Sequence, residues 1–506
     1  MKLLPPSEKI CIVGGGTSAW LTAAYLSHNN INSDIIVVDA ESGSTVEVGE
    51  ATVPTFMVFW KDCGFSRESL FNQVGATIKT GILFTNWQEE NRDIWHPFYR
   101  GQNDIWEEDP IVQQHAFKYE LWSKDQHRCD VKYSMANYDR CVLNNKIDPN
   151  QLNHWERAYT VHIDCKRLVE FIQQQNRTRF INSAVNHIIH DDTGDIKEVL
   201  LLNGEIINAD LYIDCTGFKS ILKEQKKVDL SDRLFCDTAI ASHIPYNHRV
   251  EELRPYTACD AVDHGWIWKI PLQEKYGSGL VFNRSVTEPE EAEKYFIDYW
   301  DNRITKEQCK LIDWTPYYIE NFWENNVISI GLSGGFIEPL ESTGIATMTM
   351  QIENLYGIIR EGRYSQRERD LYNSIVKSSY ERSIDFVNMH YSKSKKTGPF
   401  WEKVKEIHNP SVTQIYYENY MKSHDARMND SSFYNYSPFG YEAWVCIMSQ
   451  MNFETYAKYT HYHSRRNKNI HYYRLKEQEA SGVCYPEFME QLQLTGNYFT
   501  EKGDFL

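Results

Sequence analysis

The chain has 506 residues, a formal net charge of −17, 42% hydrophobic residues and 14% aromatic residues. This composition is typical of a globular protein with a large core, and the negative charge argues against binding to nucleic acid or to an anionic membrane surface. No apolar stretch has transmembrane length, no signal-peptide pattern is visible and the 11 cysteines show no CxxC spacing. We therefore expect a cytoplasmic protein with reduced thiols and no metal site.

Residues 9–39 predict a strand, a helix and a second strand around the glycine-rich turn GGGTSAW. In such a unit the glycines let the backbone approach a pyrophosphate at the helix N-terminus, and an acid ending the second strand holds an adenosine ribose. The pattern predicts a dinucleotide site without choosing between FAD and NAD. Its expected members are Gly14, Gly16, Thr17, Ser18, Ala19 and Asp39.

The next informative segment is GATIKTGILFTNW (residues 75–87), in which Lys79 lies in an apparent strand. In that strand Lys79 would face the same side as Gly81 and Leu83. A lone lysine in a strand is usually a solvated edge residue, but the apolar neighbours here indicate partial burial. Burial lowers the pKa of a lysine and makes its amine useful for chemistry.

A later strand, NADLYIDCTGF (residues 208–218), ends in Asp214 and Gly217. A strand that ends in D-x-T-G is common in FAD-dependent oxygenases of the glutathione-reductase type, where it returns the chain to the nucleotide. An ordinary strand followed by a turn is the alternative, and this segment by itself does not decide between them.

The run DHGWIWKIPL (residues 263–272) places Trp266 and Trp268 two positions apart. In an extended chain both indoles face one way, and we expect them to stack as a wall. Core aromatics on a strand are the more common use of tryptophan.

Residues 325–362 predict a buried strand, a loop and a helix from about Ser342 to Arg360. Flavin hydroxylases carry a G-D motif after this strand, whereas GLSGGF here has no acid. Free amides at a helix start attract anions, so Thr343 and Gly344 are candidates for binding a small anion. Alternatively, Ser342 or Thr343 caps the helix, and both readings can hold together.

The C-terminal third is dense in Tyr, Phe and Trp, and we expect helices and loops there that cover a substrate. His461, His463 and His471 lie close together in a polar, basic stretch, which favours a solvated face over a metal site.

Three of these segments, together with a fourth at residues 48–55, resemble the flavin-dependent halogenases, and most closely the tryptophan-halogenase type. GWIWKIP is similar to the family's WxWxIP signature, and VGEATVPT (residues 48–55) to its flavin-contacting strap. The family's essential lysine falls on Lys79, and its catalytic glutamate on Glu341 within FIEPLESTGI (residues 336–345). The resemblance runs from about residue 9 to 360, with weaker similarity in residues 96–98 and 399–404.

The resemblance implies a two-component halogenase that receives reduced FAD (FADH2) from a separate NAD(P)H flavin reductase. With O2 and halide it would form hypohalous acid, which travels to Lys79 and Glu341 and halogenates an electron-rich aromatic such as an indole, a phenol or tryptophan. Lys79 would hydrogen-bond the hypohalous acid or form a haloamine, and Glu341, assisted by Ser342, would polarise the halogenating species or take the arenium proton. Trp266 and Trp268 would separate flavin from substrate.

The remaining implied residues surround these groups. Halide would bind at Thr343 and Gly344, and the substrate pocket would include His96, Pro97 and Phe98. Further flavin contacts would come from Gly49, Glu50, Ala51, Thr52, Asp214, Gly217, Gly331, Gly344 and Ile345.

The implied fold is an α/β, glutathione-reductase-type FAD-binding fold with a mixed sheet. We expect residues 1–365 to form the core, with a substrate layer inserted at about 90–160 and 220–320, and residues 366–506 to form a helical subdomain. A single-component FAD-dependent aromatic hydroxylase and a non-catalytic flavoprotein are the alternatives. The native substrate, the preferred halide and a homo-oligomeric state are left open.

Overall fold

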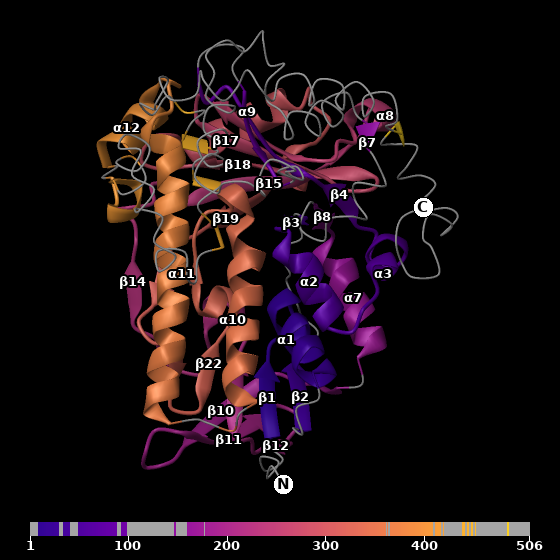
Figure 1. The fold of residues 1–506 in the computed structure, drawn as a ribbon, viewed down its shortest axis with the longest axis vertical. Helices are drawn as coiled ribbons and strands as arrows, with labels where there is room; N and C mark the ends of the chain where they lie inside the picture. Colours follow the sequence, from indigo (N-terminus) through magenta and orange to yellow (C-terminus); the bar gives the residue numbers. More distant parts are fainter. Residues whose placement is uncertain are drawn as a thin grey trace, which may run out of the picture. The chain divides into compact units, whose positions relative to one another are not determined.

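The computed structural model describes the larger part of the chain (Figure 1). The described residues are 9–29, 34–40, 49–88, 93–98, 146–147, 159–176, 178–360, 362, 365–407, 410–415, 418, 438–440, 443–444, 447–448, 451 and 483–484. His461, His463, His471 and most of the aromatic-rich C-terminal stretch lie outside them.

The chain divides into two units. The first comprises Met1–Gly75, Ile163–Leu234 and Thr315–Glu381, and the second comprises Ala76–His162, Phe235–Trp314 and Arg382–Leu506. The expected domain boundary at residue 365 stays a prediction. In the second unit, the chain from Arg382 onward is grouped with the two segments that interrupt the first unit.

The first unit is built on a six-stranded sheet with the strand order β21-β22-β13-β1-β2-β9. All neighbouring strands are parallel except β21, which is antiparallel to β22. Val13 pairs with Asp214, and Asp214 pairs with Ser329, so the carboxyl ends of these strands meet at one edge. The strands are β1 (Lys9–Val13), β2 (Asp34–Asp39), β9 (Arg179–Asn182), β13 (Leu211–Asp214), β21 (Trp323–Glu324) and β22 (Val327–Ser329).

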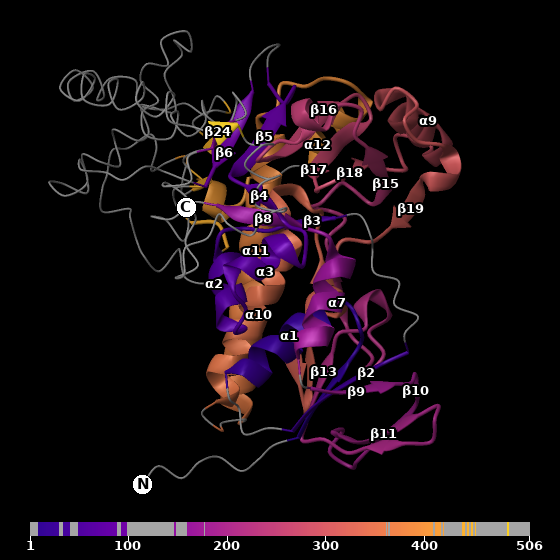
Figure 2. The ribbon, with the colours of Figure 1, turned by 90° about the vertical axis from the view of Figure 1, so that its right-hand side faces the viewer.

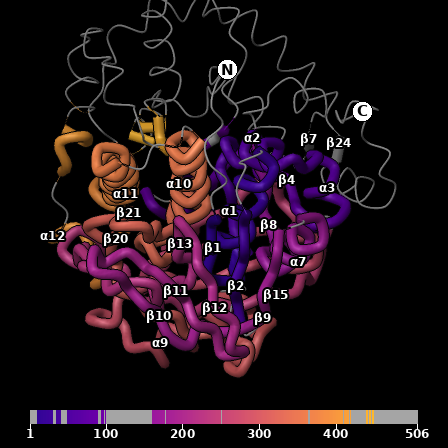
Figure 3. The backbone as a smooth tube through the Cα atoms, turned by 90° about the horizontal axis from the view of Figure 1, so that it is seen from below, coloured from indigo at the N-terminus to yellow at the C-terminus, as the bar shows by residue number. Residues whose placement is uncertain are grey.

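Helices lie on one face of this sheet and a small sheet lies on the other (Figure 3). Helix α1 (Thr17–His28) contacts α7 (Cys165–Gln175) and α10 (Thr343–Ile359). On the opposite face, Val199 and Ile207 of the small sheet join Val13 and Val38 in one buried cluster. The small sheet consists of β10 (Val185–His190), β11 (Ile196–Leu201) and β12 (Ile206–Ile207).

The other elements of the first unit are short and lie mostly in its connections. They are β3 (Glu50–Ala51), α2 (Thr55–Asp62), α3 (Arg67–Asn72), β14 (Lys227–Asp229), β20 (Tyr317–Ile319), β23 (Gly335–Phe336) and the 3-10 turns η2 (Gly217–Lys219), η4 (Gly331–Ser333) and η5 (Leu340–Ser342). This arrangement confirms the predicted strand, helix and strand at the N-terminus and the α/β FAD-binding fold class.

The second unit contains a seven-stranded mixed sheet with the order β19-β15-β18-β17-β16-β5-β6. Helix α9 (Pro289–Tyr299) packs on β15 and β18 (Figure 2), where Phe296 joins a buried cluster with Ile240, Ile267 and Leu280. The strands are β5 (Gly81–Thr85), β6 (Ile94–Pro97), β15 (Thr238–Pro245), β16 (Thr257–Val262), β17 (Gly265–Pro271), β18 (Lys275–Phe282) and β19 (Lys310–Asp313).

The remaining described elements of the second unit are short strands and several helices. Among these strands β4 (Thr77–Lys79) pairs with β8 (Thr160–Ile163), and β7 (Lys146–Ile147) pairs with β24 (Val483–Cys484). The others are α8 (Arg249–Glu252), η3 (Lys306–Gln308) and α12 (Pro399–Ile407), while α11 (Gln366–Ser392) contains the boundary between the units. None of the described helices combines the length and apolarity needed to cross a bilayer.

The apparent strand in residues 75–87 that would carry Lys79, Gly81 and Leu83 is not a single strand. The segment is two strands, β4 and β5, which belong to different sheets and are separated by Thr80. The Thr80 amide and hydroxyl both donate to the carbonyl of Pro255, each at 2.7 Å, and this contact holds the break in the strand. Lys79 and the pair Gly81 and Leu83 therefore lie on different strands, and the two-residue period of a strand no longer relates them as predicted.

Candidate active site

The three glycines after β1 have different surroundings. A Cβ on Gly14, whose φ is +125°, would lie 2.4 Å from the carbonyl oxygen of Cys215, and one on Gly15 would lie 2.0 Å from an Asp39 carboxyl oxygen. A Cβ on Gly16 would meet no heavy atom of the described residues within 4 Å. Gly14 and Gly15 are thus needed for packing at the carboxyl edge, while Gly16 opens the start of α1 to a ligand.

Asp214, at the end of β13, is fully buried and organises the loop that follows it. Its carboxylate accepts hydrogen bonds from the Thr216 amide (2.9 Å), the Thr216 hydroxyl (2.7 Å) and the Leu222 amide (2.9 Å). Burial raises the pKa of Asp214, and the bonds from Thr216 and Leu222 oppose that shift. The structure thus gives this carboxylate a role in shaping the loop, and contact with a cofactor stays a prediction.

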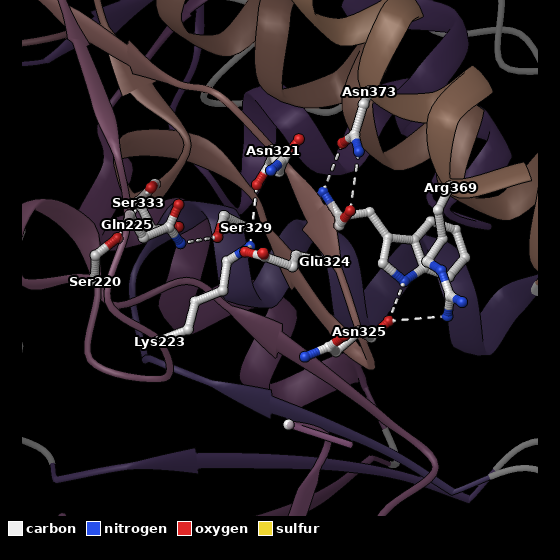
Figure 4. A network of polar contacts seen from close by, with 12 residues as sticks. Ser220, Lys223, Gln225, Asn321, Glu324, Asn325, Ser329, Ser333, Arg369 and Asn373 are labelled. Carbon is white, nitrogen blue, oxygen red and sulfur yellow. Dashed lines mark hydrogen bonds and ion pairs between the residues drawn. The ribbon is translucent and has the colours of Figure 1, made fainter. Parts of the chain in front are cut away.

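Further polar contacts join this loop to the segments around β21 and β22 (Figure 4). The Ser220 hydroxyl donates to the carbonyl of Ser333 (2.9 Å), and Gln225 Nε2 donates to the Ser329 hydroxyl (2.6 Å). Lys223 Nζ lies 3.2 Å from Glu324. These bonds fix the two loops that leave the carboxyl edge beside β1.

Gly331 is tightly confined in the turn after β22. Its φ is +74°, and a Cβ there would lie 2.9 Å from Ser18 Cβ, in the first turn of α1. Its amide donates to Gln351 Oε1 of α10 at 3.1 Å. This turn therefore links the first turn of α1 to α10. It lacks the acidic residue that flavin hydroxylases carry after this strand.

Glu50, in β3, is linked to the start of α1 through a thiol. Burial raises the pKa of its carboxyl, and a hydrogen bond with Cys165 lowers it. Burial raises the pKa of the Cys165 thiol well above its usual value, while the hydrogen bond from Thr17 lowers it. The other expected flavin contacts in this unit lie at Gly49, whose φ is +73°, and at the buried Ala51, Thr52 and Ile345.

The segment before α10 carries an unusual backbone. Glu341 (φ 65°, ψ 15°) and Ser342 (φ 61°, ψ 40°) are consecutive non-glycine residues in the left-handed region, and both are buried. Such residues cost roughly 1–3 kcal/mol each. Within the described residues Ser342 makes no side-chain capping bond, and Thr343 Oγ1 donates instead to the carbonyl of Glu338 (3.1 Å). The capping interpretation of Ser342 is therefore wrong.

Gly344, in the first turn of α10, resembles Gly16 in its surroundings. A Cβ on it would meet no heavy atom of the described residues within 4 Å. The starts of α1 and α10 thus both adjoin open space, and such starts favour negatively charged groups. The residues present fit a dinucleotide at α1 and a small anion at α10.

In the second unit, Lys79 has an exposed fraction of 0%. The hydroxyl of Thr77, two residues before it, donates to the carbonyl of Pro271 (2.5 Å), and Thr80 is held by Pro255. The carbonyl of Thr80 accepts from the Phe98 amide (2.9 Å), and Lys79 Nζ lies 5.0 Å from the centre of the Phe98 ring. The amine is therefore more deeply buried than expected, and a cation–π contact is within reach.

His162, which the sequence analysis did not single out, lies opposite Thr77 on β8. Burial holds the pKa of its imidazole well below the usual value, and the positive charge of Lys79 lowers it further. Because the Thr77 hydroxyl already donates to Pro271, the neutral ring donates from Nδ1 to Thr77 and accepts at Nε2 from Thr257 (3.1 and 2.9 Å). Its only signal in the sequence is an isolated histidine in TVHI.

His96 is buried on β6, and its ring lies 6.1 Å from that of Phe98 and 6.0 Å from that of Phe386. Phe386 in turn stacks on Phe439 at 4.3 Å. Lys79, expected in the chemistry, and His96 and Phe98, expected in the substrate pocket, thus lie in one aromatic cluster of the second unit. The third expected pocket residue, Pro97, ends β6.

Trp266 and Trp268 lie on the same face of β17, opposite Ile267 and α9, as predicted from their spacing. Their exposed fractions are 1% and 7%. Their ring centres are 6.3 Å apart and the planes are inclined at 59°, so the expected stacking is wrong. The indole of Trp268 lies over Gly279, where a Cβ would come within 2.1 Å of Cη2.

The predicted site residues are divided between the two units. Lys79, His96, Phe98 and the tryptophan pair belong to the second unit, whereas Glu341, Ser342, Thr343 and Gly344 belong to the first. Within the described residues no group of three or more His, Cys, Asp or Glu side chains is arranged to hold a metal ion.

The sequence matches the family described as tryptophan halogenase over residues 9–465. It is 29% identical to the tryptophan 6-halogenase SttH of Streptomyces toxytricini over 79% of this chain and 81% of that protein. It is 26% identical to the tryptophan 7-halogenase RebH of Lentzea aerocolonigenes, with 79% of each chain covered.

Solved structures agree with this match. The SttH crystal structure superposes with a TM-score of 0.84 at 25% identity, covering 96% of this chain and 99% of that chain. A flavin-dependent halogenase from Brevundimonas sp. BAL3 has the same fold, with a TM-score of 0.83 at 24% identity over 97% of this chain and 100% of that chain. The chain therefore belongs to the tryptophan halogenase family and is an oxidoreductase of the flavin-dependent halogenase class.

Proposed function

We propose that this protein is the halogenase component of a two-component system and transfers an oxidised halide to an electron-rich aromatic substrate. Reduced FAD, supplied by a separate NAD(P)H flavin reductase, provides with O2 the oxidising power for the halide. The open starts of α1 and α10 support this assignment, because Gly16 leaves room for a pyrophosphate and Gly344 for an anion. The relatives SttH and RebH are tryptophan halogenases, and an indole is the substrate class that we propose first.

The observation that carries the proposal is the fully buried amine of Lys79. Thr77 and Thr80, on either side of it, are anchored to Pro271 and Pro255, so the side chain starts from a rigid backbone. The ring centre of Phe98 lies 5.0 Å from the amine and His96 lies next to Phe98, so a planar substrate can stack on aromatic surface close to it. A buried ammonium or amine in such a place can hold hypohalous acid by a hydrogen bond or take up the halogen as a haloamine.

Glu341 is the proposed partner in the chemistry. A carboxylate stabilises the cationic intermediate of aromatic substitution and can accept its proton. The left-handed backbone at Glu341 and Ser342 supports a functional role, because strained residues of this kind persist mainly where the geometry is needed. The tryptophan pair is proposed to separate flavin from substrate, which suppresses direct oxygenation.

The test is an assay with a flavin reductase, NAD(P)H, FAD, each halide in turn and a panel of indoles and phenols, with products identified by mass spectrometry. Wild type should give halogenated products only when halide is present, and Lys79→Ala should give none while still binding FAD. Lys275→Met, which changes a half-buried lysine of β18 in the same unit, serves as the control and should keep activity. Oxygenated products formed without halide would favour the single-component hydroxylase instead, and near-wild-type halogenation by Lys79→Ala would overturn the role of Lys79.

A further inference from the structure

Helix α10 carries a row of polar side chains on one buried face. Thr343, Thr347 and Gln351 are spaced four residues apart, so they lie above one another along the helix. Their exposed fractions are 0%, 3% and 0%. Polar groups at such positions normally have hydrogen-bond partners, and each exception requires an explanation.

Two polar atoms in this row have no partner within the described residues: Thr347 Oγ1 and Gln351 Nε2. The amide of Gln351 has a fixed orientation, because its oxygen accepts the hydrogen bond from the Gly331 amide. Its Nε2 group is therefore the unsatisfied donor, and exchanging the oxygen and nitrogen would only lose the existing bond.

Several other helical hydroxyls of this unit behave differently from Thr347, although Ser379 Oγ of α11 also has no partner within the described residues. Thr22 and Ser27 of α1 donate to carbonyls one turn back, each at 2.6 Å, and Thr349 of α10 donates to Ala346 (3.2 Å). This back-bonding is the usual solution for hydroxyls within helices. Thr347 lacks it although the same helix offers it to Thr349, which indicates that its hydroxyl faces a different acceptor.

The row points towards the dinucleotide motif. Gln351 bonds to Gly331, and Gly331 packs on Ser18 in the first turn of α1. Thr347 lies about 6 Å closer to the start of α10 on the same face. A dinucleotide that extends from the start of α1 to the open start of α10 at Gly344 passes along this face.

We propose that Thr347 Oγ1 and Gln351 Nε2 are hydrogen-bonding groups for the bound flavin dinucleotide, donating to its oxygen atoms between the pyrophosphate and the ring. This inference rests on the proposed function, since it assumes that FAD is the ligand. It adds two residues from the middle of α10 to a site otherwise assigned to glycine-rich turns and helix starts. It also explains why two donors are buried without partners among the described residues.

The inference is tested by equilibrium binding of oxidised FAD to the full-length protein, measured by flavin fluorescence. Thr347→Val removes the hydroxyl at constant shape and should weaken FAD binding about 3- to 10-fold. Thr349→Val makes the same change two residues away, where the hydroxyl bonds within the helix, and should leave the affinity unchanged. Without FAD, Thr347→Val should melt at the wild-type temperature or above, because it removes an unsatisfied buried group.

Gln351→Glu is the second variant, because it keeps an acceptor for the Gly331 amide and removes the donor. It should also weaken FAD binding, while Thr347→Ser, which keeps a hydroxyl, should bind as wild type does and replaces the valine comparison if that variant does not fold. Wild-type affinity in Thr347→Val, or equal losses in Thr347→Val and Thr349→Val, would overturn the inference. If wild-type protein does not bind FAD, the proposed function fails, which is a separate outcome.

Discussion

The fit between Trp268 and Gly279 predicts that Gly279→Ala destabilises the second unit. The added methyl would lie 2.1 Å from Cη2 and 2.4 Å from Cζ2 of the indole, whereas ordinary contacts begin at 3.4 Å. The indole must therefore move by more than 1 Å, and the carbonyl of Ile240, 2.7 Å from the same methyl, opposes a shift of the backbone. Overpacking of this kind costs about 1–3 kcal/mol.

A matched glycine-to-alanine change in the first unit should stabilise the protein instead of destabilising it. Gly357 lies within α10, and a Cβ there meets no described heavy atom within 4 Å, so Gly357→Ala should stabilise the protein by about 0.5–1 kcal/mol. Thermal unfolding of both variants beside wild type provides the measurement. If Trp268 separates flavin from substrate as proposed, Gly279→Ala should also form less halogenated product per reduced flavin consumed in the coupled assay. If Gly279→Ala melts at the wild-type temperature or above, the described packing of Trp268 is incorrect.

Two further predictions concern carboxylates of the first unit. Burial, followed by the negative charge of Asp62, raises the pKa of Glu353 from its usual 4.5 to about 7. A raised folded-state pKa stabilises the protein below the unfolded-state value, and this contribution is lost as the pH rises through about 7. Glu353→Gln should therefore flatten the decline of melting temperature between pH 4.5 and 7, and identical slopes for both proteins would contradict the assignment. Asp214→Ala leaves three donors at Thr216 and Leu222 without their acceptor, so urea titration should show a loss of at least about 3 kcal/mol; a loss under 1 kcal/mol would contradict the loop-shaping role.

Local sequence patterns were sufficient for the dinucleotide motif and for α10. Strand β1, the glycine turn and α1 follow one another within 20 residues, so spacing and composition determine them together. The predicted helix from Ser342 to Arg360 differs from Thr343–Ile359 by one residue at each end. The common face of Trp266 and Trp268 likewise follows from the two-residue period of a strand.

The errors arose where distant residues determine the local geometry. The strand that contains Lys79 ends there because Thr80 bonds to a carbonyl 175 residues away, which no periodicity within residues 75–87 reveals. The inclination of the two indoles depends on Gly279 of the neighbouring strand, which leaves room for Trp268. His162 was missed for the same reason, since its position beside Lys79 depends on the pairing of β4 with β8.

The left-handed backbone at Glu341 and Ser342 raises the question why glycine does not occupy these two positions. Glycine would adopt both conformations without steric cost, and the motif already uses glycine at Gly344, two positions later. A side chain is nevertheless kept at two consecutive strained positions, and both side chains are buried. A carboxylate and a hydroxyl buried there at such conformational cost are difficult to explain by packing alone. The role proposed for Glu341, proton acceptance beside a helix start that adjoins open space, would account for this cost.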